Sequence, residues 1–344
     1  MNSSYTNCSQ AADVAFVSIY SLLFVVGLPL NLAALWIFFF RGALRSITTI
    51  YMKNLAASDL LLLASLPLRV YYYSKRPPLS QMVCEIAGLL LLVNMYSSIF
   101  LLTCISWDRC MAVCFPLRPW AQALRRQAKY ICAGVWALSI LGSIPSYFAS
   151  GAKGENDTRC FDSRPQYITD PRISSAMVVS FAVPLVIMVT CSCSLLRVVH
   201  QSTVVQMKLV KGAKIQHMVV TNVAIFLGCF LPYHLVLLWF QVGALNNAHW
   251  DRVYRWALLL ACVNATLDPL AYYFATETFQ HLVAMDHLFQ RRGSHTNHAE
   301  GTERLSRPLE TQHQSAWSTP VSEAPSCVKA PDLKEASASG PGQL

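Results

Sequence analysis

Seven long apolar runs divide this chain, and the stretches between them contain most of the charged residues. An α-helix needs about 20 residues to cross a hydrocarbon core of about 30 Å. The runs come close to or exceed this length and cover roughly residues 15–40, 47–73, 81–113, 130–148, 173–199, 218–242 and 253–274. The pattern predicts an all-α membrane protein built as a seven-transmembrane helix bundle.

The composition excludes several other classes of protein. The 344 residues are 54% hydrophobic and 13% charged, which leaves too little polar surface to cover a soluble globule. A net charge of +9 could indicate nucleic-acid binding, but the Lys and Arg residues fall between apolar runs and not on a separate basic domain. The twelve cysteines have no metal-ligand spacing.

The loop charges predict the orientation. One set of loops is basic and lacks Asp and Glu; it contains Arg41, Arg45, Arg118, Arg125, Arg126, Lys129, Lys208, Lys211 and Lys214. The opposite loops mix both signs of charge. An excess of Lys and Arg in short loops marks the cytoplasmic side. The protein is therefore expected to lie in the plasma membrane with its amino terminus outside the cell.

Four segments follow from these patterns. Residues 1–14 are expected to form an extracellular tail, in which Asn2 and Asn7 fit the N-glycosylation pattern. Residues 15–275 form the transmembrane domain. Residues 276–290 have the apolar spacing of a short amphipathic interfacial helix, and residues 291–344 have the composition of a disordered cytoplasmic tail.

Each span contains polar or proline residues that an inert lipid-facing helix does not need. In chain order these are Asn31, Leu55 with Asp59, Cys84, Asp108-Arg109-Cys110, Trp136, Pro184, Cys229-Phe230-Leu231-Pro232, and Asp268-Pro269 with Tyr272. This ordered set resembles the rhodopsin-like (class A) G-protein-coupled receptors and covers about residues 15–282. Further motifs, among them Leu66-Pro67, Phe115-Pro116-Leu117 and Phe230-Leu231-Pro232-Tyr233, resemble the purinergic and lysophospholipid receptor branch.

The resemblance implies a receptor that activates a heterotrimeric G protein and has no catalytic residues of its own. The residues assigned to coupling and switching are Asp108, Arg109, Phe230, Pro232, Asp268, Pro269 and Tyr272. Arg109 is expected to pair with Asp108 at rest and to meet the G protein when the sixth span moves outward. Cys110 replaces the usual aromatic residue of this motif, and the Ser- and Thr-containing tail suggests arrestin as a further partner.

Two further sites are implied. Cys84 and Cys160 are expected to form a disulfide in an oxidising compartment; the alternative is two free thiols. Asp59, Ser98, Asn264 and Asp268, with Asn31, are expected to face one polar cavity. Two buried carboxylates repel, so a proton or a bound Na⁺ should lie between them. The alternative is a static hydrogen-bonded network.

The ligand is expected at the outer half of the bundle. The candidate contacts are Arg69, Tyr73, Tyr96, Arg164, His234, Leu237, Tyr254 and Arg255. A guanidinium at the depth of Arg69 is costly unless it meets an anion. The alternative is that Arg69 and Arg255 reach water or pair with Glu85 or Asp251.

An amphipathic anion of lysophospholipid type fits these residues best. Nucleotide receptors of the branch carry a basic residue three positions after the His of the sixth span, where this chain has Leu237. The apolar lining is expected from Leu237, Leu238, Trp239, Phe240 and Val183. A receptor for a nucleotide or a small carboxylic acid is the alternative. A transporter, which would need an internal repeat and broken helices, is the alternative from another class.

Overall fold

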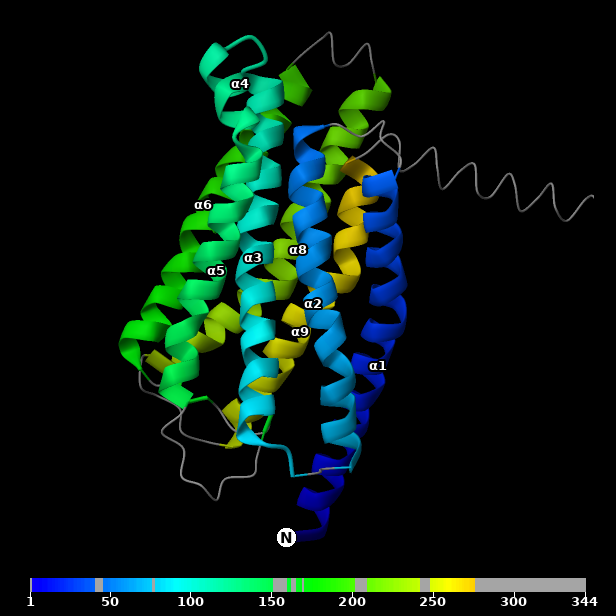
Figure 1. The fold of residues 1–344 in the computed structure, drawn as a ribbon, viewed down its shortest axis with the longest axis vertical. Coiled ribbons are helices and arrows are strands. Elements are labelled where there is room, and N and C mark those ends of the chain that lie inside the picture. The colour runs from blue at the N-terminus through cyan, green and yellow to red at the C-terminus, as the bar shows by residue number, and fades with distance from the viewer. Residues whose placement is uncertain are drawn as a thin grey trace, which may run out of the picture. The chain divides into compact units, whose positions relative to one another are not determined.

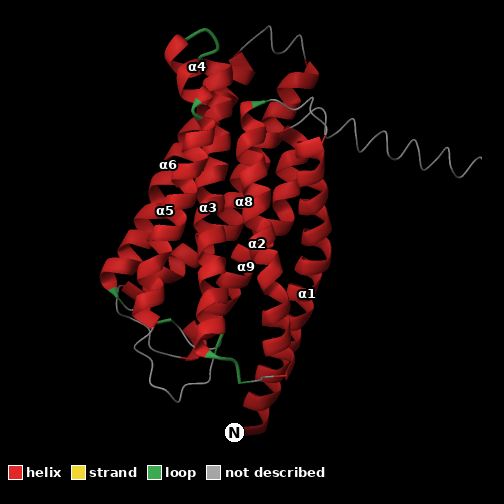
Figure 2. Ribbon diagram, viewed as in Figure 1, coloured by secondary structure: helices red, strands yellow, loops and turns green. Residues whose placement is uncertain are grey.

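The structure is a computed structural model that describes residues 2–40, 46–75, 78–150, 160–161, 165–168, 170–201, 209–241 and 248–275. All of these residues belong to the first of two compact units, Met1–Phe289. In this described part, the secondary structure consists of eight α-helices and one short 3-10 helix (Figures 1 and 2).

Seven of these helices correspond to the seven predicted spans. They are α1 (Asn2–Phe40), α2 (Ile47–Lys75), α3 (Gln81–Cys114), α5 (Ala128–Ser150), α6 (Pro171–Gln201), α8 (Leu209–Gln241) and α9 (Ala248–Ala275). Each predicted span lies within its helix, apart from residue 242, which is outside the described residues. The apolar runs were therefore a sound basis for locating the helices.

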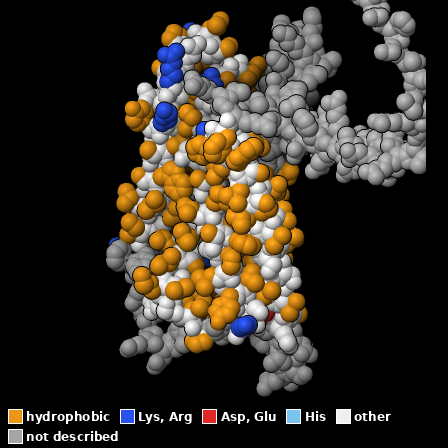
Figure 3. Space-filling model, turned by 45° about the vertical axis from the view of Figure 1, so that its right-hand side comes forward, with side chains coloured by type: hydrophobic (Ala, Val, Ile, Leu, Met, Phe, Trp, Pro, Cys, Tyr) orange, Lys and Arg blue, Asp and Glu red, His pale blue; other side chains and the backbone are white. Residues whose placement is uncertain are grey.

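Six of the helices are long and apolar enough to cross a membrane by length and composition, among the described residues. The helix that does not meet this criterion is α9, which contains Asn264, Asp268 and Pro269 in its second half. The polar residues lower the hydropathy of α9, but they face the bundle, since Asn264 and Asp268 are fully buried. In Figure 3, apolar side chains cover most of the visible face of the described part.

α1 begins earlier than expected. The helix starts at Asn2, so it includes the backbone of the segment predicted as an extracellular tail, 1–14. The stretch of α1 that meets the membrane criterion is Gln10–Phe40. The predicted interfacial helix at 276–290 and the tail at 291–344 lie outside the described residues.

Two short helices lie in connections that the sequence patterns left as loops. α4 (Pro119–Arg126) follows α3 directly and has proline at its first position, where a helix needs no backbone N–H. Its last turn contains Arg125 and Arg126, whose charges suit the negative end of a helix dipole. The 3-10 helix η1 (Gln166–Ile168) precedes α6.

α3 is the central helix of the bundle. It packs against α2, α5, α6, α8 and α9, whereas α1 packs against α2 and α9 at the edge. Figure 1 shows α3 between α2 and α5, with α4 at the end of the bundle opposite the start of α1. We call the end that carries Lys75 and Gln81 the outer end and the end that carries α4 the inner end.

Candidate functional site

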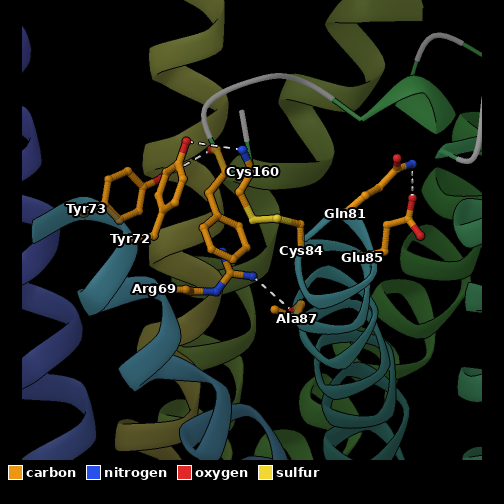
Figure 4. The surroundings of a disulfide bond; sticks show 9 residues. Arg69, Tyr72, Tyr73, Gln81, Cys84, Glu85, Ala87 and Cys160 are labelled. Atoms are coloured by element: carbon orange, nitrogen blue, oxygen red, sulfur yellow. Dashed lines mark hydrogen bonds between the residues drawn. A yellow bond between two sulfur atoms is a disulfide. The ribbon is translucent and has the colours of Figure 1, made fainter. Parts of the chain in front are cut away.

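A disulfide bond joins the start of α3 to the chain segment before α6. Cys84 and Cys160 are bonded, with their Cα atoms 5.3 Å apart, so the expected pairing is confirmed (Figure 4). The Cys160 backbone N–H donates to the Tyr72 hydroxyl at 3.2 Å, and the Tyr73 hydroxyl donates to the Phe161 carbonyl at 3.3 Å. These bonds hold the Cys160–Phe161 segment against the outer ends of α2 and α3.

Arg69 is a buried cation beside this segment, with only 4% of its surface exposed. Its Nη2 donates to the Ala87 carbonyl at 3.2 Å (Figure 4). Its guanidinium carbon lies 4.4 Å from the centroid of the Phe161 ring. Its Nε has no hydrogen-bond partner. No Asp or Glu among the described residues forms an ion pair with Arg69. Glu85, which was a candidate partner, accepts a hydrogen bond from the Gln81 amide at 2.7 Å. The side chain therefore neither reaches water nor pairs with Glu85.

Arg69 and the buried tyrosines Tyr20, Tyr167 and Tyr254 together form a polar patch at the outer end. Tyr20 of α1 interacts electrostatically with Arg69, and the hydroxyls of Tyr167 and Tyr254 lie 3.3 Å apart. Burial raises the pKa of Tyr167 above its ordinary value, so its hydroxyl stays protonated at neutral pH. The patch thus offers hydroxyl groups beside the Arg69 cation.

Three further outer candidates lie near one another. Tyr73 and Tyr254 lie beside Arg69 and its tyrosines, and Arg255 lies 5.7 Å from the centroid of the Phe16 ring, which stacks on Tyr73 with the ring centroids 5.0 Å apart. Arg164 lies outside the described residues.

His234 lies deeper, on α8, and is 3% exposed. Its Nδ1 lies 2.8 Å from the Phe230 carbonyl, which can only accept, so Nδ1 carries the proton. Nε2 is then an acceptor in the neutral ring and lies 3.4 Å from the Tyr96 hydroxyl. The imidazole also stacks on Phe181 with the ring centroids 4.1 Å apart. His234 and Tyr96 are therefore brought together, as part of the packed core between α3, α6 and α8.

The expected apolar lining of the ligand site is largely wrong. Val183, Leu238 and Trp239 are about half exposed, at 54%, 46% and 54%, on the outward face of their helices. Leu237 does point inward and is fully buried in the main core. Counting apolar residues along α8 could not separate these faces, because a span in lipid is apolar on both sides.

The two carboxyl groups predicted to face one polar site lie close together. Asp59 of α2 and Asp268 of α9 are fully buried and are near enough to interact electrostatically. The Asn94 amide donates to Asp59 Oδ1 at 3.0 Å, and the Tyr272 hydroxyl donates to Asp59 Oδ2 at 3.5 Å. The Asn264 amide donates to Asp268 Oδ2 at 2.9 Å.

Several oxygen atoms in this carboxyl site lack partners. Asp268 Oδ1, Asn264 Oδ1 and Ser98 Oγ are buried and have no hydrogen-bond partner in the described part of the chain. The Asn31 amide nitrogen donates to the Gly27 and Ala265 carbonyls at 3.0 and 2.7 Å, and Asn31 Oδ1 is a further buried oxygen without a hydrogen-bond partner in the described residues. Asn31 therefore ties α1 to α9 beside the site, a role that the sequence did not indicate.

Asp108, at the inner end of α3, has two partners that were not expected. Its carboxylate accepts from the Thr48 hydroxyl of α2 at 2.5 Å and from Arg125 Nε of α4 at 2.7 Å. The neighbouring Arg109 interacts with Asp108 through its charge. Asp108 therefore has partners beyond the expected Arg109 and joins three helices, α2, α3 and α4.

The remaining switch residues lie in the interior. Phe230 is fully buried below His234, with its ring edge against Phe226 at a centroid distance of 5.8 Å. Pro232 and Pro269 lie inside α8 and α9, where each removes one backbone donor from its helix. Tyr272 reaches the carboxyl site through Asp59, as described above.

Four contributions were missed by sequence reasoning. They are Phe161 against Arg69, Asn94 on Asp59, and Thr48 and Arg125 on Asp108. Asn94 carried a signal, because it precedes Ser98 by four residues and must share its helix face. The other three come from loops or helix ends, where spacing says nothing about long-range contacts.

Comparison with known proteins agrees with this architecture. Residues 30–272 match the sequence model of the family described as "7 transmembrane receptor (rhodopsin family)". Lysophosphatidic acid receptor 4 of Homo sapiens is 34% identical over 276 residues, which cover 76% of this chain and 75% of that protein. Lysophosphatidic acid receptor 6 of Homo sapiens is 33% identical over 79% of this chain and 84% of that protein. A purinoceptor of Xenopus laevis is 31% identical over 88% of this chain and 58% of that protein.

Proposed function

Because this chain belongs to the rhodopsin family of seven-transmembrane receptors, we propose that it binds an extracellular amphipathic anion of lysophospholipid type. Membership of the family makes the chain a multi-pass plasma-membrane receptor that couples to G protein and is not an enzyme.

The observation that carries the ligand proposal is the buried charge of Arg69. Removing a guanidinium from water costs several kcal/mol unless an anion and hydrogen-bond acceptors replace the water. In the described residues, the Arg69 guanidinium has the Ala87 carbonyl, the Phe161 ring and the uncharged Tyr20 hydroxyl near it, and its Nε has no acceptor. A phosphate or carboxylate head group supplies the missing charge and accepts from two guanidinium nitrogens at once.

The surroundings of Arg69 favour a ligand with one anionic head. Tyr20, Tyr167 and Tyr254 are hydroxyl-bearing residues near the guanidinium, and a lysophospholipid head offers phosphate and hydroxyl oxygens to them. Three residues after His234, α8 carries the buried apolar residue Leu237 and not a basic residue that could bind further phosphate groups. The relatives include two lysophosphatidic acid receptors, which supports the same class, and one purinoceptor, which keeps a nucleotide as the competing ligand.

The orientation proposal has two supports. A disulfide such as Cys84–Cys160 persists in an oxidising compartment, which supports an extracellular position for the outer end. The basic α4 helix lies at the inner end, in agreement with an excess of Lys and Arg on the cytoplasmic side. On this orientation Asn2 and Asn7 would lie on the side of the membrane where N-glycans are found, and the Ser- and Thr-containing tail would lie on the side where arrestin is found.

The ligand test is a G-protein activation assay in cells. We expect lysophosphatidic acid to activate the parent receptor, and Arg69→Ala to reduce its potency at least about 30-fold, since a buried charge pair lost on one side costs about 2 kcal/mol or more. Arg69→Lys should lose less, because it keeps the charge. Arg172→Ala, which removes an exposed arginine of the same end, is the matched control.

Two results would contradict the ligand assignment. One is an unchanged potency of lysophosphatidic acid in Arg69→Ala at equal surface expression. The other is activation of the parent by a nucleoside diphosphate or a short-chain carboxylic acid in the absence of any response to lysophosphatidic acid. The second result would show that the receptor recognises a nucleotide or a small carboxylic acid and not a lysophospholipid.

We assign the contact with G protein to Arg109. The guanidinium lies at the inner end of α3 beside Asp108, which already binds Thr48 and Arg125. Outward movement of α8 about Pro232 would let Arg109 meet the partner protein. Arg109→Ala should abolish G-protein activation while ligand binding stays close to that of the parent. Retained activation would show that another residue of the inner end makes this contact.

We also propose that the carboxyl site holds Na⁺. Two carboxyl groups in contact need a proton or a cation between them, and oxygen ligands suit a hard cation. Asp268 Oδ1, Asn264 Oδ1 and Ser98 Oγ are buried without partners among the described residues, and Asp59 lies against Asp268. These four residues would hold the ion, which would supply positive charge between the carboxylates.

The sodium proposal is tested by thermal unfolding of the purified receptor. Replacing choline chloride by sodium chloride at constant ionic strength should raise the unfolding temperature, because an ion that binds only the folded state stabilises it. Asp59→Asn should remove the difference between the two salts. Equal unfolding temperatures in both salts for the parent would contradict the site.

A further inference from the structure

Three free thiols meet at the inner end of the bundle. Cys110 and Cys114 belong to α3 and Cys191 belongs to α6. The Cys110 and Cys114 sulfur atoms are 3.8 Å apart. Cys191 packs against the same apolar cluster, which contains Cys110 and residues of α6 and α8. Cys110 therefore shares this cluster with one thiol of its own helix and with one thiol of a neighbouring helix, and it interacts electrostatically with the latter.

Helix geometry decides which of the two contacts is able to become a disulfide. Residues four apart on a regular α-helix have Cβ atoms about 5–6 Å apart, whereas a disulfide needs about 3.5–4.5 Å. α3 is a continuous helix through Cys110 and Cys114, so this pair does not close without breaking the helix. The Cys110–Cys191 pair bridges two helices and is free of that constraint.

The two sulfur atoms also differ in access. Cys110 is buried with 5% exposed, whereas Cys191 is half-buried. Oxidation begins at an accessible thiol and is completed by a second thiol next to it. In this pair, Cys191 is the thiol that meets the oxidant and Cys110 is the resolving thiol.

We propose that Cys110 and Cys191 form a reversible oxidation site, at which a peroxide converts the two thiols into a disulfide between α3 and α6. Hydrogen peroxide transfers one oxygen to the Cys191 thiol, which becomes a sulfenic acid, and one water leaves. The Cys110 sulfur then attacks the Cys191 sulfur, and the hydroxyl leaves with the thiol proton as a second water. Two thiols are oxidised and one peroxide is reduced to two waters.

The inference rests on the proposed orientation and deepens the proposed coupling site. In the cytoplasm, glutathione and thioredoxin reduce disulfides, so a bond formed at the inner end is transient. Cys110 directly follows Arg109 in α3, the residue assigned to the G protein. A bond from Cys110 to α6 fixes two helix ends beside that arginine and is expected to lower coupling.

The chemical test needs no G protein. Purified full-length receptor is treated with hydrogen peroxide, its remaining thiols are alkylated, and the peptides are analysed by mass spectrometry without reduction. We expect a crosslinked peptide pair that contains Cys110 and Cys191, that increases with peroxide and that disappears after dithiothreitol. Cys191→Ser should abolish it. Cys193→Ser, which changes an exposed thiol two residues further along α6, is the matched control and should retain it.

Absence of this crosslink in a receptor that still binds ligand would overturn the proposal. A Cys110–Cys114 crosslink in its place would overturn it too. Folding of each variant is checked by surface expression and thermal unfolding, and a Cys191→Ala variant replaces Cys191→Ser if the latter expresses poorly.

The functional test compares agonist-stimulated G-protein activation before and after peroxide. Activation by the parent and by Cys193→Ser should fall several-fold and recover with dithiothreitol, whereas activation by Cys191→Ser should not change. Equal loss in Cys191→Ser would overturn control through this bond. Failure of the proposed function is distinguishable, because it would leave even the fully reduced parent inactive.

Discussion

The carboxylate of Asp108 accepts a hydrogen bond of 2.7 Å from Nε of Arg125. The same carboxylate accepts from Thr48 at 2.5 Å, so one acidic group joins α2, α3 and α4 at the inner end. The Asp108 side chain is only 2% exposed, and Arg125 is 24% exposed. This arrangement places a nearly buried anion between Arg125 and the neighbouring Arg109.

Asp108→Asn is expected to raise ligand-independent G-protein activation. The substitution removes the negative charge next to Arg109 and weakens the hydrogen bond from Arg125 that anchors α4. The Arg109 side chain and α4 are then less constrained. Arg125→Gln should raise basal activation less, because Asp108 keeps its charge and its bond to Thr48. The measurement is basal signalling at matched surface expression, and basal signalling equal to that of the parent in Asp108→Asn would contradict this interpretation.

Phe161→Leu is expected to lower the potency of an anionic agonist by about 2- to 30-fold. The ring centroid lies 4.4 Å from the Arg69 guanidinium carbon, and such a contact contributes about 0.5–2 kcal/mol. Its loss also lets Arg69 move within its site. The check is a dose–response curve with lysophosphatidic acid; in the Arg69→Ala background, Phe161→Leu should have little further effect, because the pair is then already broken.

Removal of the Cys84–Cys160 disulfide is expected to lower ligand binding and surface expression. The bond closes a long stretch of chain and holds Phe161 next to Arg69. Cys84→Ser, Cys160→Ser and the double variant should be equally impaired, because either single change already breaks the bond. A double variant much worse than both single variants would show that the two cysteines act separately.

Gly27→Ala is expected to destabilise the bundle by about 1–3 kcal/mol through overpacking. A Cβ atom at Gly27 would lie 2.9 Å from a terminal carbon of Leu63 and 2.9 Å from the Thr266 hydroxyl, so these two side chains, or α1 itself, would have to shift. Gly142→Ala is the matched control, since a Cβ there meets nothing within 4 Å. The unfolding temperature in detergent should fall for the first variant and stay level or rise for the second.

The positions of the helices and several functional pairs were predictable from the residues. A membrane span is recognised by length and composition, because every backbone polar group in lipid must be satisfied within the helix. The buried carboxyl groups of Asp59 and Asp268 were recognisable because charges inside a span are costly. The Cys84–Cys160 bond followed from the family resemblance and from the shared outer side of the two residues.

The contacts made by loops and helix ends were not predictable. Phe161 lies beside Arg69 although the two residues are far apart in the sequence. Arg125 lies beside Asp108 although the two residues belong to different helices, α4 and α3. The face that each apolar residue presents was also undetermined, and this made the lining assigned to Val183, Leu238 and Trp239 wrong. In lipid the outward face of a helix is as apolar as the inward face, so hydropathy loses the signal that separates them in water.

The amino-acid sequence alone determined that this chain crosses a membrane as helices and that it carries ionisable side chains at depths where they need partners. Only the tertiary structure determined which residues those partners are. A charge inside a span must be compensated wherever it lies, so its cost is a local property that the sequence displays. The compensating group comes from whichever helix end or loop packs nearby, and packing is a property of the whole bundle.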